Sequence, residues 1–484
     1  SLDVSGSNYA IGIKGNWSNS STFVDQAGTV TFNGGDAQTV TSGGSDFYNL
    51  TTTGSSTAVT LADAMTIAND LTIASSSSLD VSGSNYAIGI KGNWSNSATF
   101  VDQSGTVTFD GGDAQTVTSG GSDFYNLTTA TSSTALTISD NTTIANNLTI
   151  ASGTTLETGS NDVTVDALLD IAGSSTVNPG GKYVLEDATV SGTLTVDADG
   201  SNNATLDFST ATGNVDFAVT GTLILDGEDA NNRAIVSSDN DSRIDFDISS
   251  AGILNADYFT MTYPTDAGFK ISSSGTQVIS YGNFDGPDGA SGVLLDLSST
   301  GTVSSPSAAG EITGCNFENT GAGGGTNGIN VKADASTQVI TFTSYGGTLA
   351  STATVAEAND SDNGDPGDKL FFFNNEFYSH NNDDPNTLGN WWSTTVGSGI
   401  NPSNFTTSAH KFIVQTGDTY TANGTWSVAG ELQVIGTLDV NSRTVTITGA
   451  TDVDGTLIIS SGTYNADGAS DIDGTLSITG TGVY

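Results

Sequence analysis

The chain has 484 residues, and its 53 acidic and 10 basic residues give a formal net charge of −43. Ten dispersed cations cannot form the basic patch that nucleic-acid binding needs, and an anionic membrane surface would repel the chain. The sequence contains no apolar run of about 18 residues, so no transmembrane helix is predicted. A single cysteine excludes an internal disulfide framework. We therefore expect neither a nucleic-acid partner nor insertion into a membrane.

Two tandem repeats begin the chain. Residues 1–77 and 78–154 align without a gap and differ at 13 of 77 positions. The phrase FYNLT, for example, begins at Phe47 and again at Phe124. A gapless alignment means that each copy has one fixed structural length, as the units of repeat architectures do.

A shorter period of 19 residues recurs near the other end, where the phrase GTL begins at Gly436, Gly455 and Gly474. Nineteen residues suit one turn of a parallel β-solenoid with three short strands, and a 77-residue copy would then make three or four turns. Alternation of apolar residues with Thr or Ser, as in 29–32 and 444–447, has the period of two that strands require. We predict an all-β fold, a long parallel β-helix whose corners carry Gly, Asn and Asp.

The predicted organisation has four parts. Residues 1–154 are the two tandem repeats, residues 155–357 continue the β-helix with longer turns, and residues 411–484 are C-terminal turns with the 19-residue period. Residues 358–410 are an acidic and aromatic loop excursion or small subdomain, which we expect to be a lateral insertion on the β-helix. Disorder is the alternative for so polar a chain, and the recurring β-branched strands argue against it.

The repeated phrase GNWSNSSTFVDQAGTVTFNGGDAQTV, followed by FYNLT, resembles the tandem repeats of large secreted surface proteins of Bacteroidota-like bacteria. The resemblance covers residues 1–154 well, and the middle of the chain looks like a generic right-handed parallel β-helix. It implies a right-handed solenoid at the cell surface with a structural or adhesive role. It carries no catalytic residues.

An acidic loop within the predicted excursion alternates carboxylates with small residues. Calcium takes several oxygen ligands of this kind, although the loop lacks the full twelve-residue spacing with a terminal Glu. A solvated loop is the alternative, and we expect no other cofactor. The candidate calcium ligands are Asp360, Asp362, Asp365 and Asp368.

Two adjacent tryptophans follow this loop, Trp391 and Trp392, with His380 close in the sequence. Aromatic rings can stack on the apolar face of a sugar, so we name these three residues as a candidate glycan-binding site. The alternative is that the rings seal the excursion onto the β-helix. Trp17 and Trp94 hold equivalent repeat positions and are expected to be structural.

Parallel β-helices also include polysaccharide lyases and hydrolases, which need clustered carboxylates with a nearby cation. The basic residues in the middle of the chain are Arg233, Arg243 and Lys270, and they would have to partner neighbouring aspartates. Cys315 lies at an inward-facing position of the strand alternation, has no histidine near it in the sequence, and is expected to be buried. We expect no enzymatic activity, with a β-helix lyase or hydrolase as the weaker alternative.

The ends of the sequence bear on assembly. Ser1 is the first residue of a repeat unit, Tyr484 follows the strand 476–478, and neither end has a capping or blocking segment. Uncapped strands pair with other chains, so we expect either a segment of a longer protein or head-to-tail stacking into a filament. The lack of an initiator Met and of a signal peptide predicts a secreted, processed chain. The expected function is an extracellular homopolymeric rod; the alternative is an adhesin stalk presenting residues 358–410 to a glycan.

Overall fold

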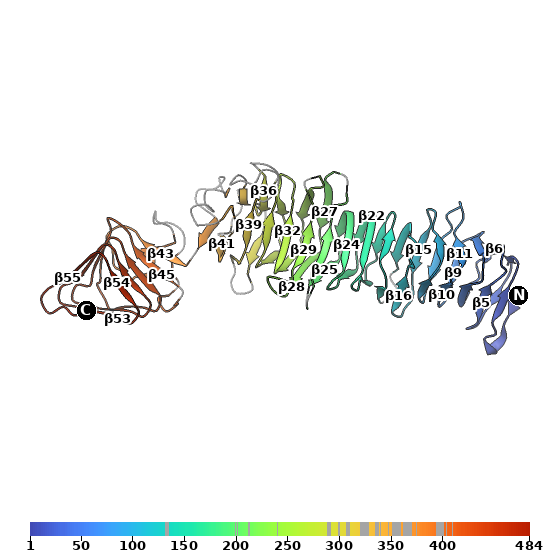
Figure 1. Cartoon of the computed structure of the whole chain (residues 1–484), viewed down its shortest axis with the longest axis horizontal. Helices are drawn as coiled ribbons and strands as arrows, with labels where there is room; N and C mark the ends of the chain where they lie inside the picture. Colours follow the sequence, from blue (N-terminus) through green and yellow to red (C-terminus); the bar gives the residue numbers. More distant parts are fainter. Residues whose placement is uncertain are drawn as a thin grey trace. The chain divides into compact units, whose positions relative to one another are not determined.

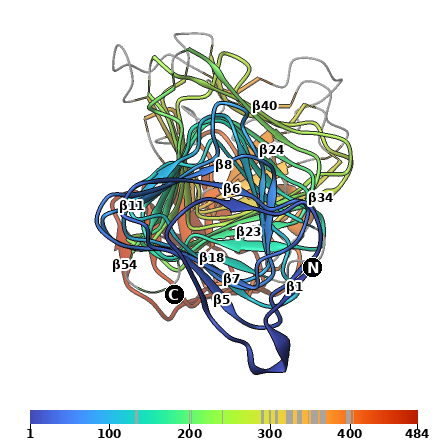
Figure 2. The ribbon, with the colours of Figure 1, turned by 90° about the vertical axis from the view of Figure 1, so that its right-hand side faces the viewer.

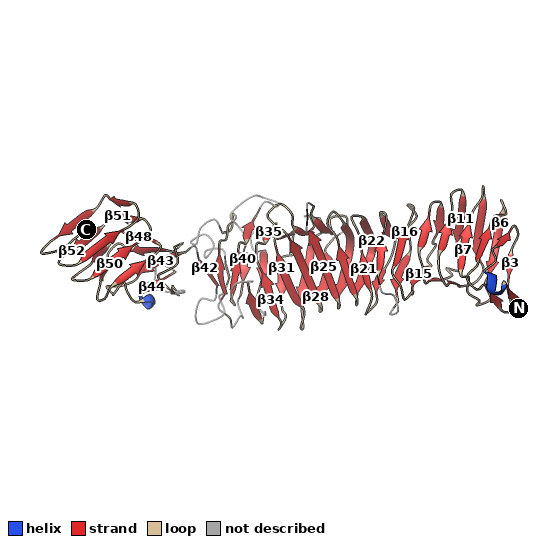
Figure 3. Ribbon diagram, turned by 90° about the horizontal axis from the view of Figure 1, so that it is seen from below, coloured by secondary structure: helices blue, strands red, loops and turns tan. Residues whose placement is uncertain are grey.

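The computed structural model is built of short strands joined by turns (Figure 3). It forms two compact units, unit 1 (Ser1–Gln338 and Gly346–Asp362) and unit 2 (Val339–Tyr345 and Asn363–Tyr484). Within the described residues the helices are short 3-10 segments, and none has the length and apolarity needed to cross a membrane. The structure describes residues 1–484 except 131–134, 199, 201, 212, 240, 288–291, 299–300, 306–309, 320–328, 334–337, 339, 347, 351–359, 362–369, 374, 394–400, 403 and 409.

Unit 1 is a three-sided parallel β-solenoid, and with unit 2 the chain makes about 20 turns. The predicted all-β parallel solenoid is therefore confirmed. Figure 1 shows the strands of unit 1 stacked side by side. One side is a 14-stranded sheet of β2 (Ile11–Ile13), β5 (Thr29–Phe32), β7 (Asn49–Thr52), β10 (Leu71–Ile73), β13 (Trp94–Asn96), β16 (Gln115–Thr118), β18 (Leu136–Ile138), β21 (Thr155–Glu157), β23 (Ser174–Val177), β25 (Thr193–Ala198), β28 (Thr222–Gly227), β31 (Ile253–Asp257), β34 (Thr276–Ile279) and β37 (Thr302–Ser304).

The other two sides begin with separate sheets, and strands of successive turns overlap when unit 1 is viewed along its stack (Figure 2). The second side starts with β3 (Trp17–Ser18), β6 (Ala37–Thr41), β8 (Thr57–Leu61), β11 (Ser77–Asp80) and β14 (Thr99–Val101). The third side starts with β9 (Met65–Ile67), β12 (Ile88–Ile90), β15 (Thr106–Phe109), β17 (Asn126–Thr129) and β20 (Leu148–Ile150).

Alternation along each strand fills the core. In β5, Val30 and Phe32 are buried while the two threonines between them face outward. Val30 is in register with Leu50, which is in register with Leu71, so apolar side chains form a column along the stack. Neighbouring turns lie about 4.8 Å apart, and each buried aliphatic side chain contributes about 1.5–3 kcal/mol. A narrow column is therefore enough to fold a polar chain.

Buried polar side chains join the turns as well. Gln115 is buried, and its Nε2 donates to the carbonyl oxygens of Ile90 at 3.1 Å and Gly92 at 2.7 Å on the preceding turn. Its Oε1 accepts from the backbone N–H of Gly111 at 3.2 Å. The first copy repeats these bonds with Gln38. The glutamine of the repeated phrase DAQTV is thus a satisfied core residue rather than an exposed polar one.

Equivalent strands of the two repeats lie on different sides of the solenoid. β3 carries Trp17 and belongs to the second side, whereas its counterpart β13 carries Trp94 and belongs to the 14-stranded sheet. From β2, the chain returns to the same side of the solenoid three times, at β5, β7 and β10. β12, the counterpart of β2, lies two sides further along the chain than β10. One copy therefore advances three and two-thirds turns, and the next is rotated by one side.

Unit 2 is a second parallel solenoid with three sides. Leu438, Leu457 and Leu476 are in register on adjacent strands, which confirms that 19 residues make one turn. Its sides are β43 (Glu376–Ser379), β45 (Lys411–Val414), β48 (Glu431–Val434), β51 (Thr451–Val453) and β54 (Ser470–Ile472); β46 (Thr419–Thr421), β49 (Thr437–Asp439), β52 (Thr456–Ile459) and β55 (Thr475–Ile478); and β47 (Trp426–Val428), β50 (Thr444–Ile447) and β53 (Thr463–Ala466).

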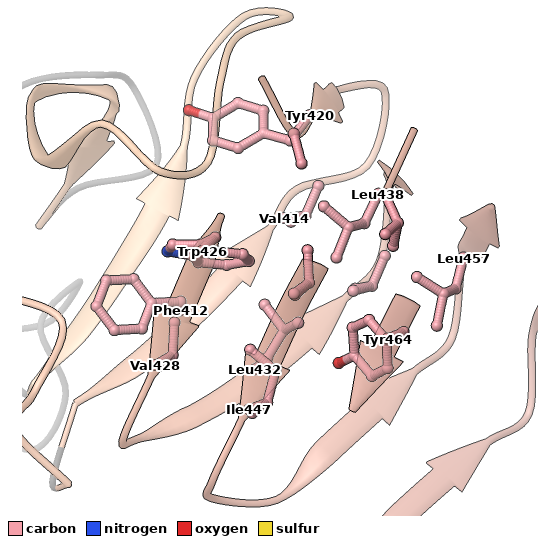
Figure 4. Close-up of a cluster of buried hydrophobic side chains, with 14 of the residues drawn as sticks. Phe412, Val414, Tyr420, Trp426, Val428, Leu432, Leu438, Ile447, Leu457 and Tyr464 are labelled. Carbon is pink, nitrogen blue, oxygen red and sulfur yellow. The ribbon is translucent and has the colours of Figure 1, made fainter. Parts of the chain in front are cut away.

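The glycines of the GTL phrases mark a close approach between turns. A Cβ on Gly455 would overlap the carbonyl oxygen of Gly436, and one on Gly474 would overlap that of Gly455. Only glycine leaves room for the next turn at this corner. Leu438 and Leu457 of these phrases lie in a core with aromatic residues such as Tyr420, Trp426 and Tyr464 (Figure 4).

The stretch 358–410 contains strands of two kinds. β43 pairs in parallel with β45 and is a turn of the unit 2 solenoid. β44 (Trp391–Trp392) pairs antiparallel with β43 and is the terminal strand of that sheet. Much of the remainder lies outside the described residues.

A matched pair of substitutions tests the column of stacked side chains. Trp94 is 1% exposed and Trp17 is half-buried, although both have the same neighbours in sequence. We expect Trp94→Ala to lower the free energy of unfolding by about 3–5 kcal/mol and Trp17→Ala to lower it by less. Urea unfolding followed by far-ultraviolet circular dichroism measures both. Equal losses would show that stacking of a preceding turn adds no stability.

Candidate functional site

The first turn of unit 1 carries a pocket of about 450 Å³, lined by Ser1, Leu2 and residues 16–23. Trp17 forms its aromatic wall and packs edge-on against Phe23, with ring centroids 4.9 Å apart. Behind it, Phe47 lies 5.5 Å from the Trp17 ring. The pocket therefore lies at the end of the apolar column that runs through the solenoid.

The second repeat shows the same surface when a turn covers it. Trp94 packs against its two phenylalanines as Trp17 does, at 4.8 and 5.1 Å. Strand β10 lies on Trp94, with Leu71 in register with the indole residue. Leu79 is 0% exposed, whereas its counterpart Leu2 is 50% exposed. The exposed first turn thus has the shape and composition of a surface that, one repeat later, binds a solenoid turn.

The last strand of unit 2, β55, is less buried than the strand before it in the sheet. Leu476 and Ile478 of β55 are in register with Leu457 and Ile459 of β52. The β52 residues are 0% exposed, while Leu476 is 36% and Ile478 is 48% exposed. Burial of such side chains under a further turn would contribute about 1.5–3 kcal/mol each.

The predicted calcium loop is described at one of its four carboxylates. Asp360 precedes Ser361, which forms a parallel bridge with Lys332. Asp362, Asp365 and Asp368 lie outside the described residues. Across the part of the chain that the structure describes, no three His, Cys, Asp or Glu residues are grouped to hold a metal ion. The calcium site stays a prediction.

A ladder of aspartates lies on unit 2. Asp452 and Asp471 are in register on adjacent strands, as the 19-residue period predicts. The Nε2 of Gln433 donates to the carboxylates of Asp452 at 3.0 Å and Asp454 at 3.2 Å. Burial, followed by the charges of the neighbouring aspartates, raises the pKa of Asp452. The ladder is therefore a place of like-charge repulsion that one amide partly relieves.

Sequence reasoning missed two carboxyl groups that the repeat duplicates. Burial, with a smaller contribution from the charge of Asp46, raises the pKa of Asp25 to about 6. In the second copy, burial and the charge of Asp123 raise the pKa of Asp102 in the same way. Both residues stand in the identical phrase FVDQ, one residue after an outward-facing valine. The recurrence of this phrase in both repeats is the sequence feature that could have identified the two carboxyl groups.

The candidate glycan site is divided by the structure. Trp391 is 0% exposed, and its Nε1 donates to the carbonyl oxygen of Pro385 at 2.8 Å. It packs at 5.5 Å against Trp426 in the core, so it offers no ring face to a sugar, and this corrects the prediction for Trp391. Trp392 and His380 are half-buried, and the backbone N–H of His380 donates to a core tyrosine at 3.0 Å.

The basic residues considered for a lyase-like cleft bind the solenoid itself. Arg243 is buried, and its Nη1 donates to the carbonyl oxygens of Pro264 and Gly286, each at 2.8 Å. Arg233 makes the same contact with two carbonyl groups on later turns. Lys270 lies 3.8 Å from an aspartate on the neighbouring strand. Each arginine thus joins successive turns through backbone oxygens.

Cys315 is buried, as the sequence predicts, at 1% exposed. Burial raises the pKa of its thiol to about 12. The thiol is therefore protonated at neutral pH and is a packing residue, because the reactive form of cysteine is the thiolate.

Replacement of Asp25 and Asp102 by Asn should flatten the pH dependence of stability. A carboxyl with a pKa of about 6 when folded and 3.8 ordinarily binds more protons in the folded state. Its contribution is fully present below pH 3.8 and is lost as pH rises through 6. We expect the urea midpoint of the natural chain to fall more steeply between pH 5 and pH 7 than that of the double variant. Asp36→Asn with Asp113→Asn, an exposed pair, is the control; identical slopes in all three chains would contradict the assignment.

Comparison of the chain with protein-family models, with curated protein sequences and with solved structures finds no match. Function must therefore be argued from the solenoid and its edges.

Proposed function

We propose that the chain is a structural subunit, an extracellular rod that stacks head to tail with further copies into a filament or surface layer. The supporting observation is how one repeat binds the turns before it. Leu71 is in register with Trp94 and Leu79 with Val59, and these side chains are buried between parallel strands of successive turns. A surface that binds a turn within the chain is suited to bind a turn from another copy.

Backbone hydrogen bonds would supply the specificity of such a junction. Between the turn of residues 65–73 and the second repeat, the N–H of Leu71 donates to the carbonyl of Asn93, and the N–H of Lys91 donates to that of Ile67, each at 2.9 Å. The first repeat carries strands of nearly the same sequence. Unpaired edge strands bind further strands readily, and heterologous contacts that do not close give filaments.

Charge would determine how the rods are arranged. A net charge of −43 on a chain with ten cations opposes side-by-side contact and favours solubility. Calcium would reduce this repulsion at carboxylate ladders such as that of Asp452 and Asp471, and at the acidic loop around Asp360. We therefore include calcium as a proposed ligand of the assembled form, and we propose a structural rather than a catalytic role.

Electron microscopy of the purified, tag-free protein tests this function. We expect long uniform fibres in buffer with calcium, and their shortening in EDTA would place calcium in the contacts. Thermal unfolding with and without calcium supplies the matching stability measurement. Isolated rods at all protein concentrations, in both buffers, would overturn the proposal of self-assembly.

An adhesin stalk is the second candidate, favoured by one surface feature of unit 2. Trp392 and Tyr378 are half-buried and directly opposite each other on antiparallel strands, and the Tyr378 hydroxyl donates to Glu376 at 2.5 Å. An aromatic pair beside a carboxylate can stack on a sugar and accept hydrogen bonds from its hydroxyl groups.

Glycan-array binding separates the two candidates. If the chain is a stalk, Trp392→Ala should abolish binding while Trp391→Phe, a change in the core, leaves binding intact. The mechanism is loss of the exposed ring face, so folding measured by circular dichroism should not change. Absence of glycan binding by the natural chain, or binding unaffected by Trp392→Ala, would remove this candidate.

A further inference from the structure

We propose that Tyr258 and Tyr281 form a modification site, at which one-electron oxidation joins the two rings into a dityrosine and so links two turns of unit 1 covalently. The inference does not depend on head-to-tail assembly, because both residues belong to one chain. The rings are stacked, with centroids 4.4 Å apart and planes inclined by 4°. Tyr281 is 38% exposed and Tyr258 is half-buried, so an oxidant can reach the pair.

The two tyrosines occupy the same corner of successive turns. Ala256 of β31 is in register with Ile279 of β34. Two residues further along each turn, Tyr258 therefore lies opposite Tyr281. Their φ angles of 43° and 50° lie in the left-handed region, which bulky residues rarely adopt. Glycine meets that backbone requirement without strain, so the use of two large rings points to a role for the side chains.

The next turn holds the stacked rings in place. Ser280 and Thr313 form a parallel bridge, so the residue opposite Tyr281 on that turn is Gly314. A Cβ on Gly314 would overlap the ring of Tyr281. The Tyr281 ring therefore lies between the ring of Tyr258 and the backbone of Gly314, and its freedom to turn away from Tyr258 is small.

Arg233 fixes the backbone beside both rings. Its Nη1 donates to the carbonyl oxygen of Phe259, the residue after Tyr258, at 2.8 Å and to that of Tyr281 at 2.6 Å. Two bonds from one nitrogen keep the two corners at a constant separation. Groups held in contact in this way react without the entropic cost of a bimolecular encounter. The pair is therefore preorganised for coupling.

The coupling removes one hydrogen atom from each phenol. A one-electron oxidant takes an electron and a proton from each hydroxyl group and leaves two phenoxyl radicals. These radicals combine through one carbon–carbon bond between a Cε atom of Tyr258 and a Cε atom of Tyr281. Each of these carbons then loses its proton and each oxygen regains one, which restores two phenols. With hydrogen peroxide as the oxidant, one peroxide is reduced to two molecules of water for each dityrosine formed.

A nearby tyrosine shares the strained backbone but not the stacking. Tyr263 has a φ angle of 57°. Its ring lies against Gly286, where a Cβ would overlap it, and the guanidinium of Arg243 lies 5.8 Å from its centroid. Tyr263 is therefore a matched control for the proposed site.

Peptide mapping of the oxidised full chain tests the site. The protein is treated with a peroxidase and hydrogen peroxide at low concentration, and the monomer is isolated, denatured and digested with trypsin. Tyr258 lies in the tryptic peptide 244–270, and Tyr281 is the single tyrosine of the peptide 271–332. We expect these two peptides to be recovered as one linked species, whose mass is their sum less two hydrogen atoms. Absence of that species from oxidised monomer would overturn the inference.

Conservative variants assign the link to its residues. Tyr258→Phe retains the stacked ring and removes the phenol, so folding should be preserved and the linked species should be lost completely. Tyr263→Phe alters the same tryptic peptide and should leave the yield unchanged. Persistence of the link in Tyr258→Phe would overturn the assignment. Tyr9 is 64% exposed, and a product map dominated by its links would show that accessibility rather than stacking determines the reaction, which would also overturn it.

Urea unfolding supplies a second measurement. A covalent bond between turns restricts the unfolded chain, so the oxidised natural chain should have a higher urea midpoint than the untreated chain. Oxidised Tyr258→Phe should match its own untreated form. An unchanged midpoint in fully linked protein would exclude a stabilising role for the link. Absence of fibres from linked protein would contradict the proposed function and leave this inference standing.

Discussion

Each turn of this protein is buried only by the turns on either side of it, and every other property follows from that dependence. Leu457 has no exposed surface because β49 and β55 lie on both sides of its strand, while Leu476, one turn later, is 36% exposed. A globular core is closed by its own chain, but a solenoid has a free face wherever stacking stops. The proposed assembly would therefore use the same interaction that stabilises the chain.

The fold was predictable because two sequence patterns, the alternation of apolar and polar residues and the 19-residue period, indicate the same architecture. Alternation in phrases such as TVTF at Thr29–Phe32 states which side chains face inward, and the 19-residue spacing of Leu438, Leu457 and Leu476 states the length of a turn. Both are local patterns that a three-sided stack converts directly into structure. The burial of Cys315 followed from the same alternation.

The site residues were harder, because their roles depend on neighbours distant in sequence. Two adjacent tryptophans do not reveal which one faces inward, and the stack places Trp391 inside and Trp392 at the surface. Arg243 has a side chain long enough to reach carbonyl groups on two later turns, which no local pattern indicates. The raised pKa of Asp25 likewise arises from burial beside a turn about twenty residues away.

Each repeat advances three and two-thirds turns, so successive repeats are rotated about the solenoid axis. Because one copy ends one side out of phase with its start, a feature on the repeat moves around the axis from copy to copy and returns to its first side after three copies. An array of such repeats would therefore be decorated in a slow spiral rather than along one face. Its surface would present the same chemistry in every direction around the axis.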